Sequence, residues 1–249
     1  MACPFVCSMD RTRLTFAPDI TLDARRAVWL AETHVLTVAD LHLGYAWAHR
    51  HDGNLLPLSA RDDTAERLLG LVEDYIPHEL VLLGDIVHRA VSLPSLKDEL
   101  CALFSQLSER VALRLIAGNH DVRLAGLLRE CGIDAEVIRE WRAGSHLLLH
   151  GDGTDEATAA SQLEAALERS GLVLIGHEHP AISVSDGVAT RAKCPCFLVA
   201  PALVVLPAFS RWSAGSDVRG RGQMSSFTRQ AKPDRAVAIA AGKLMPLPF

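Results

Sequence analysis

Five short apolar runs between residues 34 and 180 constrain the fold more than any other feature of the sequence. Each run is continuous and rich in Val, Leu and Ile, as is typical of strands that are buried on both faces. The runs are HVLTVAD, LVLLGD, ALRLIAGN, SHLLLHGD and LVLIGH. Because helical patterns separate them, the sequence predicts repeated β-α units and a largely parallel central sheet.

Helix-start patterns support this reading. Ser59 and Asp62 form a capping-box pattern ahead of an amphipathic stretch, and Ser95 and Asp98 repeat it. We expect further helices after the segments GNHD and GDGT. The β-α alternation therefore extends over most of the first 180 residues.

The pattern changes after Pro180 to strand-like runs without helices between them. These runs are AISVSD, CFLVAPALVVLP and AVAIAAGKLMPL, and they predict a second sheet packed against the first. Residues 211–235 are rich in Gly, Ser and Arg and predict a long surface loop. The cationic side chains of this loop have two equally good interpretations. They form a basic strip that guides a phosphate backbone, or they are a solvated surface. We expect one domain spanning residues 1–249.

Composition excludes several classes of protein. The chain is 49% hydrophobic and 22% charged, which is typical of a globular protein and not of a disordered one. Its net charge of −5 provides no global basic field for nucleic acid. The sequence has no secretory-signal pattern and no apolar run that could span a bilayer, so we expect a cytoplasmic location and no membrane partner. The six cysteines are therefore expected to be reduced thiols.

Each of the five runs ends in side chains that can bind a metal ion. In open α/β sheets, ligands bind beyond the carboxyl ends of the strands, so we expect these side chains to converge. Oxygen and imidazole donors suit Mn²⁺, Fe or Zn²⁺, and seven of them exceed what one ion needs. The candidate ligands are Asp40, His42, Asp85, Asn119, His150, His177 and His179.

The segment LIGHEHPAI contributes two of these candidates. If it is extended, His177 and His179 point to one face and Glu178 to the other. The spacing of about 6.6 Å between alternate residues suits two neighbouring ions better than a single one. We therefore expect the two histidines to serve different metals.

The ordered blocks ADLHLG, LGDIVH, GNHD, LHGD and GHEHP resemble the calcineurin-like metallophosphoesterase superfamily over residues 36–180. The segments DLHLGYA, KCPCFLV and VLPAFS are similar to a narrower branch, which contains ICC-like phosphoesterases and bacterial DNA-ligase-associated DNA damage response endonucleases. This resemblance implies a four-layer α/β/β/α sandwich, with two mixed sheets flanked by helices. It also implies partnership with a DNA ligase and a helicase.

By the same resemblance, the donors are shared between two divalent ions, with Asp85 as the bridge. We expect Mn²⁺, with Fe or Zn²⁺ as alternatives. His120 faces the scissile phosphate, while Asp121 either orients His120 or caps a helix. One ion is held by Asp40, His42, Asp85 and His179, and the other by Asp85, Asn119, His150 and His177.

These residues predict hydrolysis of P–O bonds. Two ions stabilise the attacking and leaving oxygens of an in-line displacement, and a hydroxide between them is the expected nucleophile. His120 then protonates the leaving oxygen. We expect a phosphodiesterase that acts on DNA in repair. The alternatives are a small-molecule phosphatase or nucleotide phosphodiesterase and a non-catalytic scaffold, although a scaffold does not require the complete donor set.

Overall fold

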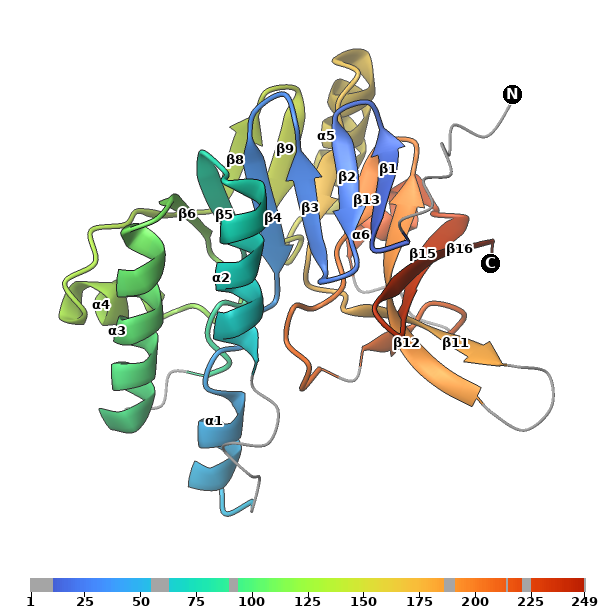
Figure 1. Ribbon diagram of the computed structural model, residues 1–249. Helices are drawn as coiled ribbons and strands as arrows, with labels where there is room; N and C mark the ends of the chain where they lie inside the picture. The colour runs from blue at the N-terminus through green and yellow to red at the C-terminus, as the bar shows by residue number, and fades with distance from the viewer. Residues whose placement is uncertain are drawn as a thin grey trace.

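Two β-sheets pack face to face and carry helices on both outer faces (Figure 1). This architecture comes from a computed structural model, which describes residues 11–54, 63–89, 94–185, 191–213, 215–220 and 225–248. The order of the layers is helix, sheet, sheet and helix. The expected four-layer sandwich is therefore confirmed.

The first sheet has seven strands that follow one another in chain order, and its second half is parallel. Neighbouring strands from β1 to β4 are antiparallel. The strands are β1 (Arg13–Ala17), β2 (Ile20–Asp23), β3 (Ala27–Leu30), β4 (Val35–Ala39), β5 (Glu79–Leu83), β6 (Ala112–Ile116) and β7 (Val137–Ile138).

The second sheet is mixed, with β9, β10 and β13 parallel at its centre. Its main path runs β14-β11-β12-β13-β10-β9-β8, and β15 pairs with β12 and β16. The strands are β8 (Glu140–Ala143), β9 (His146–Leu149), β10 (Val173–Ile175), β11 (Pro180–Ser185), β12 (Arg191–Ala200), β13 (Leu203–Val205), β14 (Ser216–Asp217), β15 (Arg235–Ala240) and β16 (Lys243–Pro248).

The helices complete three hydrophobic cores, one on each outer face and one between the sheets. Helices α2, α3 and α4 cover the first sheet, and α5 and α6 cover the second. Among the described residues, no helix is both long and apolar enough to cross a membrane. The helices are α1 (Tyr45–His51), α2 (Thr64–Tyr75), α3 (Pro94–Ser108), α4 (Leu124–Glu130), α5 (Glu156–Glu168) and α6 (Ser226–Ala231).

Strand β5 shows why the apolar runs are continuous. Leu80 and Leu82 face the helical core of the first sheet, whereas Val81 and Leu83 face the core between the sheets. Since neither face of this strand meets water, both sets of alternating positions are apolar. All five strands predicted from these runs are present.

Several sequence expectations differ from the structure. Strands β1 to β3 were not predicted, because short runs such as ITLD and AVWL carry too little periodicity to be assigned.

The surface-loop prediction for residues 211–235 is wrong at 226–231, where α6 buries Phe227 and Thr228. Ser59 and Asp62 lie outside the described residues. Ser95 and Asp98 lie inside α3, which begins at Pro94.

The prediction that all six cysteines are thiols is also wrong. Cys101 of α3 and Cys131, which follows α4, form a disulfide across a sequence separation of 30. Composition gave no indication of this pair, because packing of the two helices brings the cysteines together. Cys194 and Cys196 are free and buried, as the prediction states for them.

We expect the Cys101→Ser/Cys131→Ser double variant to be less stable than the parent by about 2–4 kcal/mol, because the bond limits the freedom of the unfolded chain. Urea unfolding with and without dithiothreitol measures the difference. The double variant is the control, since its unfolding midpoint should not respond to the reductant. An equal response of parent and variant would contradict a disulfide in the folded protein.

Candidate metal centre

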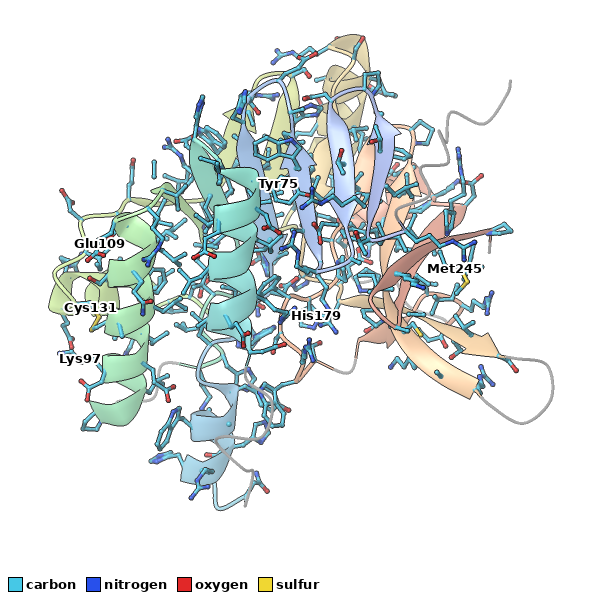
Figure 2. All side chains as sticks on the ribbon, viewed as in Figure 1. Tyr75, Lys97, Glu109, Cys131, His179 and Met245 are labelled. Atoms are coloured by element: carbon cyan, nitrogen blue, oxygen red, sulfur yellow. A yellow bond between two sulfur atoms is a disulfide. The ribbon has the colours of Figure 1, made fainter. Side chains whose placement is uncertain are left out.

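The carboxyl ends of five strands meet at one edge of the two sheets, and the candidate ligands lie there. The first sheet contributes the residues that follow β4, β5 and β6, and the second sheet contributes those that follow β9 and β10. Figure 2 labels His179 at this edge, beneath the ends of the strands. The predicted convergence of strand ends is thus a feature of the structure.

One donor group contains Asp40, His42, Asp85 and His179, each offering one ligand atom within 4.8 Å of the others. The Nε2 atoms of His42 and His179 are 3.1 Å apart. His179 Nε2 lies 3.3 Å from Asp40 Oδ1, and His42 Nε2 lies 3.9 Å from Asp85 Oδ2. Two imidazole nitrogens and two carboxylates therefore converge on one point.

A second donor group contains Asp85, His150 and His177, and Asp85 belongs to both groups. His150 Nε2 lies 3.4 Å from Asp85 Oδ1, and it is buried without a hydrogen-bond partner among the described residues. Asn119 is exposed in the loop after β6. The two groups thus bring together six of the seven candidate ligands and place His177 and His179 in different groups, whereas the part predicted for Asn119 stays a prediction.

The electrostatics distinguish His42 and His177 from His150. Burial, with a further contribution from the neighbouring His179, lowers the pKa of His42 to about 4. Burial also lowers the pKa of His177, so both imidazoles are neutral at physiological pH and can donate a lone pair. Burial alone would lower the pKa of His150, but the carboxylates of Asp85 and Asp40 raise it to about 9.

Asp85 remains ionised despite its burial. Burial by itself would raise its pKa, but interactions with His150 and His120 hold the pKa below its usual range. Buried carboxylates, neutral imidazoles and an orphan nitrogen form a donor set that fits divalent metal ions. Oxygen and imidazole donors for divalent ions are the kind of site that the residues after the five apolar runs predicted.

Five of the candidate ligands have a left-handed backbone conformation. Asp40, His42, Asp85, His177 and His179 all have φ between 46° and 68°. Residues with a Cβ atom adopt such angles at a cost of order 1–3 kcal/mol, and they cluster at functional sites. Since His177 and His179 both adopt this conformation, the segment LIGHEHPAI is not extended. The alternation of side chains along an extended strand therefore does not explain how the two histidines reach the donor groups.

Glycines leave room for the donor side chains. A Cβ atom at Gly118 would overlap Asp85 Oδ1 and His150 Nε2, and one at Gly84 would overlap the His150 ring. A Cβ atom at Gly176 would lie 2.7 Å from Asp40 Oδ2. These glycines precede candidate ligands in the blocks LGD, GNHD and GHEH, where the sequence gave them no role.

His120 lies beside the centre, with 38% of its side chain exposed and Nε2 3.8 Å from Asp85 Oδ2. Its Nδ1 atom lies 2.7 Å from the carbonyl oxygen of His88, to which it donates in the Nδ1–H tautomer. That contact orients Nε2 towards the donors. The predicted role of His120 towards the scissile phosphate stays a prediction, and the group that contacts its Nδ1 atom is a backbone carbonyl and not Asp121.

Asp121 joins the loops after β5 and β6. Its buried carboxylate accepts hydrogen bonds from the backbone N–H groups of Ile86, Val87 and Gly118, at 3.2, 3.0 and 2.9 Å. Burial raises its pKa, although these hydrogen bonds oppose the shift. The N-cap of α4 is Arg123, so Asp121 does not cap this helix either. Asp121 therefore has neither of the two predicted roles. Its carboxylate holds the two loops together.

Glu178 and His88 contribute in ways that the sequence did not indicate. Glu178 is buried and accepts hydrogen bonds from Ser225 N and the Thr228 hydroxyl, so it ties the histidine loop to α6. The His88 ring stacks on His120 at a centroid distance of 5.7 Å. Neither role could be deduced from sequence, because the partners are distant along the chain or belong to the backbone.

Comparison with known proteins concerns the family and the fold of the chain. The profile of the calcineurin-like phosphoesterase superfamily domain matches residues 34–201. The structure of the nuclease MPE from Pseudomonas putida is similar, with a TM-score of 0.64, 22% sequence identity and coverage of 98% of this chain and 100% of that chain. YfcE, a phosphoesterase from E. coli, aligns with a TM-score of 0.40 and 12% identity, over 86% of this chain and 98% of that chain. No curated protein sequence matches the chain.

We expect Gly118→Ala to lower the affinity for Mn²⁺ by about tenfold or more, because the added methyl group displaces Asp85 and His150. Isothermal titration calorimetry measures the binding. Gly126→Ala on α4 is the matched control, since its methyl group would meet nothing within 4 Å. Equal affinities for the two variants would contradict a metal site formed by Asp85 and His150.

Asp121→Ala is expected to lower the free energy of unfolding by about 3 kcal/mol, because three buried N–H groups lose their acceptor. His120→Ala should change it by less than about 1 kcal/mol, since its ring is partly exposed. Urea denaturation of both variants measures the difference. If Asp121→Ala retains full stability and loses only activity, Asp121 serves catalysis instead.

Proposed function

The chain belongs to the calcineurin-like phosphoesterase superfamily and is a metal-dependent phosphoesterase, and on this premise we propose that it is a two-metal phosphodiesterase that cleaves DNA. One observation carries the proposal. Two donor groups at the strand ends share the single carboxylate of Asp85. A shared carboxylate is what a pair of neighbouring ions requires.

In this proposal the ions divide the donors as the two groups do. Asn119 completes the second group with its amide oxygen. When bound, the ions supply Lewis-acid stabilisation of the phosphoryl oxygens and activate water at neutral pH. Oxygen and imidazole donors favour Mn²⁺, with Fe or Zn²⁺ as alternatives. One ion takes Asp40, His42, Asp85 and His179, and the other takes Asp85, Asn119, His150 and His177.

The side chain of His120 acts on the leaving group. Its Nδ1 atom is held by the His88 carbonyl, so Nε2 is directed towards the donors. In the imidazolium form, Nε2–H donates a proton to the oxygen that leaves phosphorus. A positioned acid of this kind contributes about 10²–10⁴-fold to the rate.

A series of rings beside the centre supports a substrate that contains nucleobases. Trp212 stacks on Tyr45 at 5.7 Å, and Tyr45 lies 4.4 Å from His49 and 4.5 Å from His88. His88 in turn stacks on His120. Partly exposed aromatic rings bind bases by stacking, without regard to sequence.

Two further considerations favour DNA. The branch that the sequence resembles includes endonucleases of DNA repair, and the Pseudomonas putida neighbour of similar fold is named a nuclease. We carry nuclease activity, and with it a role in repair, over to this chain as part of the proposal. Cleavage of the diester then precedes the sealing or resynthesis of the strand.

The test gives the Mn²⁺-loaded protein four substrates: 4-nitrophenyl phosphate, bis(4-nitrophenyl) phosphate, single-stranded DNA and double-stranded DNA. We expect cleavage of the diester and of DNA, and loss of both activities in EDTA. Asp85→Ala removes the shared donor and His120→Ala removes the acid, so each should lower kcat by about 100-fold or more.

The remaining outcomes separate the alternatives. Cleavage of the monoester alone would exclude a nuclease and indicate a small-molecule phosphatase. Inertness towards every phosphoester, together with stable capture of a protein partner, would indicate a scaffold. Full activity of Asp85→Ala would exclude the two-metal centre.

A further inference from the structure

A cavity of about 1040 Å³ lies outside the two donor groups and is rich in arginine. It lies among the turn between β2 and β3, helix α2, the segment after β13 and the hairpin of β15 and β16. Its residues play no part in holding a metal ion. Five arginines line it, namely Arg13, Arg25, Arg26, Arg67 and Arg211.

Among the described residues, three carboxylates face the five arginines of this cavity. Asp23 and Asp74 pair with Arg13 and Arg25. Asp63 faces both Arg67 and Arg211, at 3.0 and 2.6 Å. The guanidinium of Arg26 donates to the carbonyl oxygens of Ala208 and Ser210.

Among the residues that the structure describes, positive charge therefore exceeds negative charge at the end of the cavity where Arg26, Arg67 and Arg211 meet Asp63. Burial, followed by the charges of Arg67 and Arg211, lowers the pKa of Arg26 to about 10. Burial is the larger cause of this shift, and the repulsion of the neighbouring guanidinium groups adds to it. An anion bound there relieves this repulsion and accepts hydrogen bonds from the guanidinium groups.

The segment after β13 connects this cationic end to the metal centre. Phe209 N donates to Ala39 O at 2.7 Å and Ser210 N donates to Asp40 O at 3.1 Å, while Ser213 Oγ lies 2.7 Å from His179 Nδ1. Arg211 lies between these contacts. Since each residue spans at most about 3.6 Å, the backbone of Arg211 is within roughly 7 Å of that of Ser213.

Successive phosphates of a nucleic-acid strand advance by about 3.4 Å along the axis of a duplex, and by more when the strand is extended, so a strand bound at the metal centre can pass Arg211 within a few nucleotides. We propose that the cationic end of the cavity binds a phosphate of the strand one to three nucleotides from the cleaved bond, with Arg211 as its principal contact. This inference rests on the proposed function. It assigns a polynucleotide, rather than a mononucleotide or a small phosphoester, as the substrate.

Arg211 is distinguished from its neighbours by its contacts. Arg26 and Arg67 bind the carbonyl oxygens of residues 208–210 and stabilise the loop. Arg211 binds Asp63 instead, and 52% of its side chain is exposed. It can exchange Asp63 for a phosphate, because Asp63 retains Arg67 as a partner.

The test compares Arg211→Gln with the parent in the Mn²⁺-loaded full chain. We expect kcat/KM for a single-stranded 12-mer to fall about tenfold, mainly through KM, which corresponds to one lost charged contact. Turnover of bis(4-nitrophenyl) phosphate, which carries one phosphate and offers Arg211 no second one, should change by less than about twofold. Arg142→Gln is the charge-matched control, since Arg142 is an exposed residue of β8 near the start of β9.

Binding is measured separately from cleavage. Fluorescence anisotropy of a labelled 12-mer gives the affinity as a function of salt, for His120→Ala alone and for the Arg211→Gln/His120→Ala double variant. Loss of one phosphate contact should reduce the slope of log K against log salt concentration by about 0.7. This arm tests the inference even if the parent cleaves only small diesters.

Three results would overturn the inference. One is unchanged affinity and unchanged kcat/KM for the 12-mer, and another is absence of 12-mer binding by the His120→Ala protein. The third is an equal loss of activity on the 12-mer and the small diester, which would assign Arg211 to loop structure. Failure of the proposed function appears differently, as a parent protein that does not cleave DNA.

Discussion

Left-handed backbone at the strand ends is the constraint on which the rest of the site depends. Five donor residues adopt positive φ, each at a cost of order 1–3 kcal/mol. Glycine would remove that cost, but it offers no ligand atom. The surrounding hydrogen bonds hold the geometry instead: Asp40 N donates to Gly84 O, His42 N to Asp85 O, and His177 N to the Asp40 carboxylate. Four of the five strained residues are thus joined to another strand end.

The same residues concentrate negative charge inside the protein. Asp40 and Asp85 are 0% and 3% exposed, and their ion-pair partners among the described residues are histidines. Because a buried carboxylate is unfavourable without compensation, the loops around them supply backbone N–H groups and a raised pKa at His150. Divalent cations provide the compensation that neutral imidazoles cannot.

The sequence predicts what is local and periodic. Apolar runs located the strands, and the polar residue at each run's end located the candidate ligands, because parallel strands end at a common edge. Long-range pairing could not be predicted: the Cys101–Cys131 disulfide, the Glu178 anchor on α6 and the contacts of Asp121 all join residues that packing brings together. The same holds for the arginine cavity, whose residues come from segments that are far apart in the chain.

The two sheets each supply half of the centre. Asp40, His42 and Asp85 follow strands of the first sheet, whereas His150, His177 and His179 follow strands of the second. Neither donor group is complete within one sheet. The apolar core between the sheets therefore sets the distances between donors, and the hydrogen bonds of residues 209 and 210 to β4 and Asp40 fix the two edges in register. Because the packing of the two sheets brings the donors together, changes in that core are expected to affect the chemistry as well as the stability.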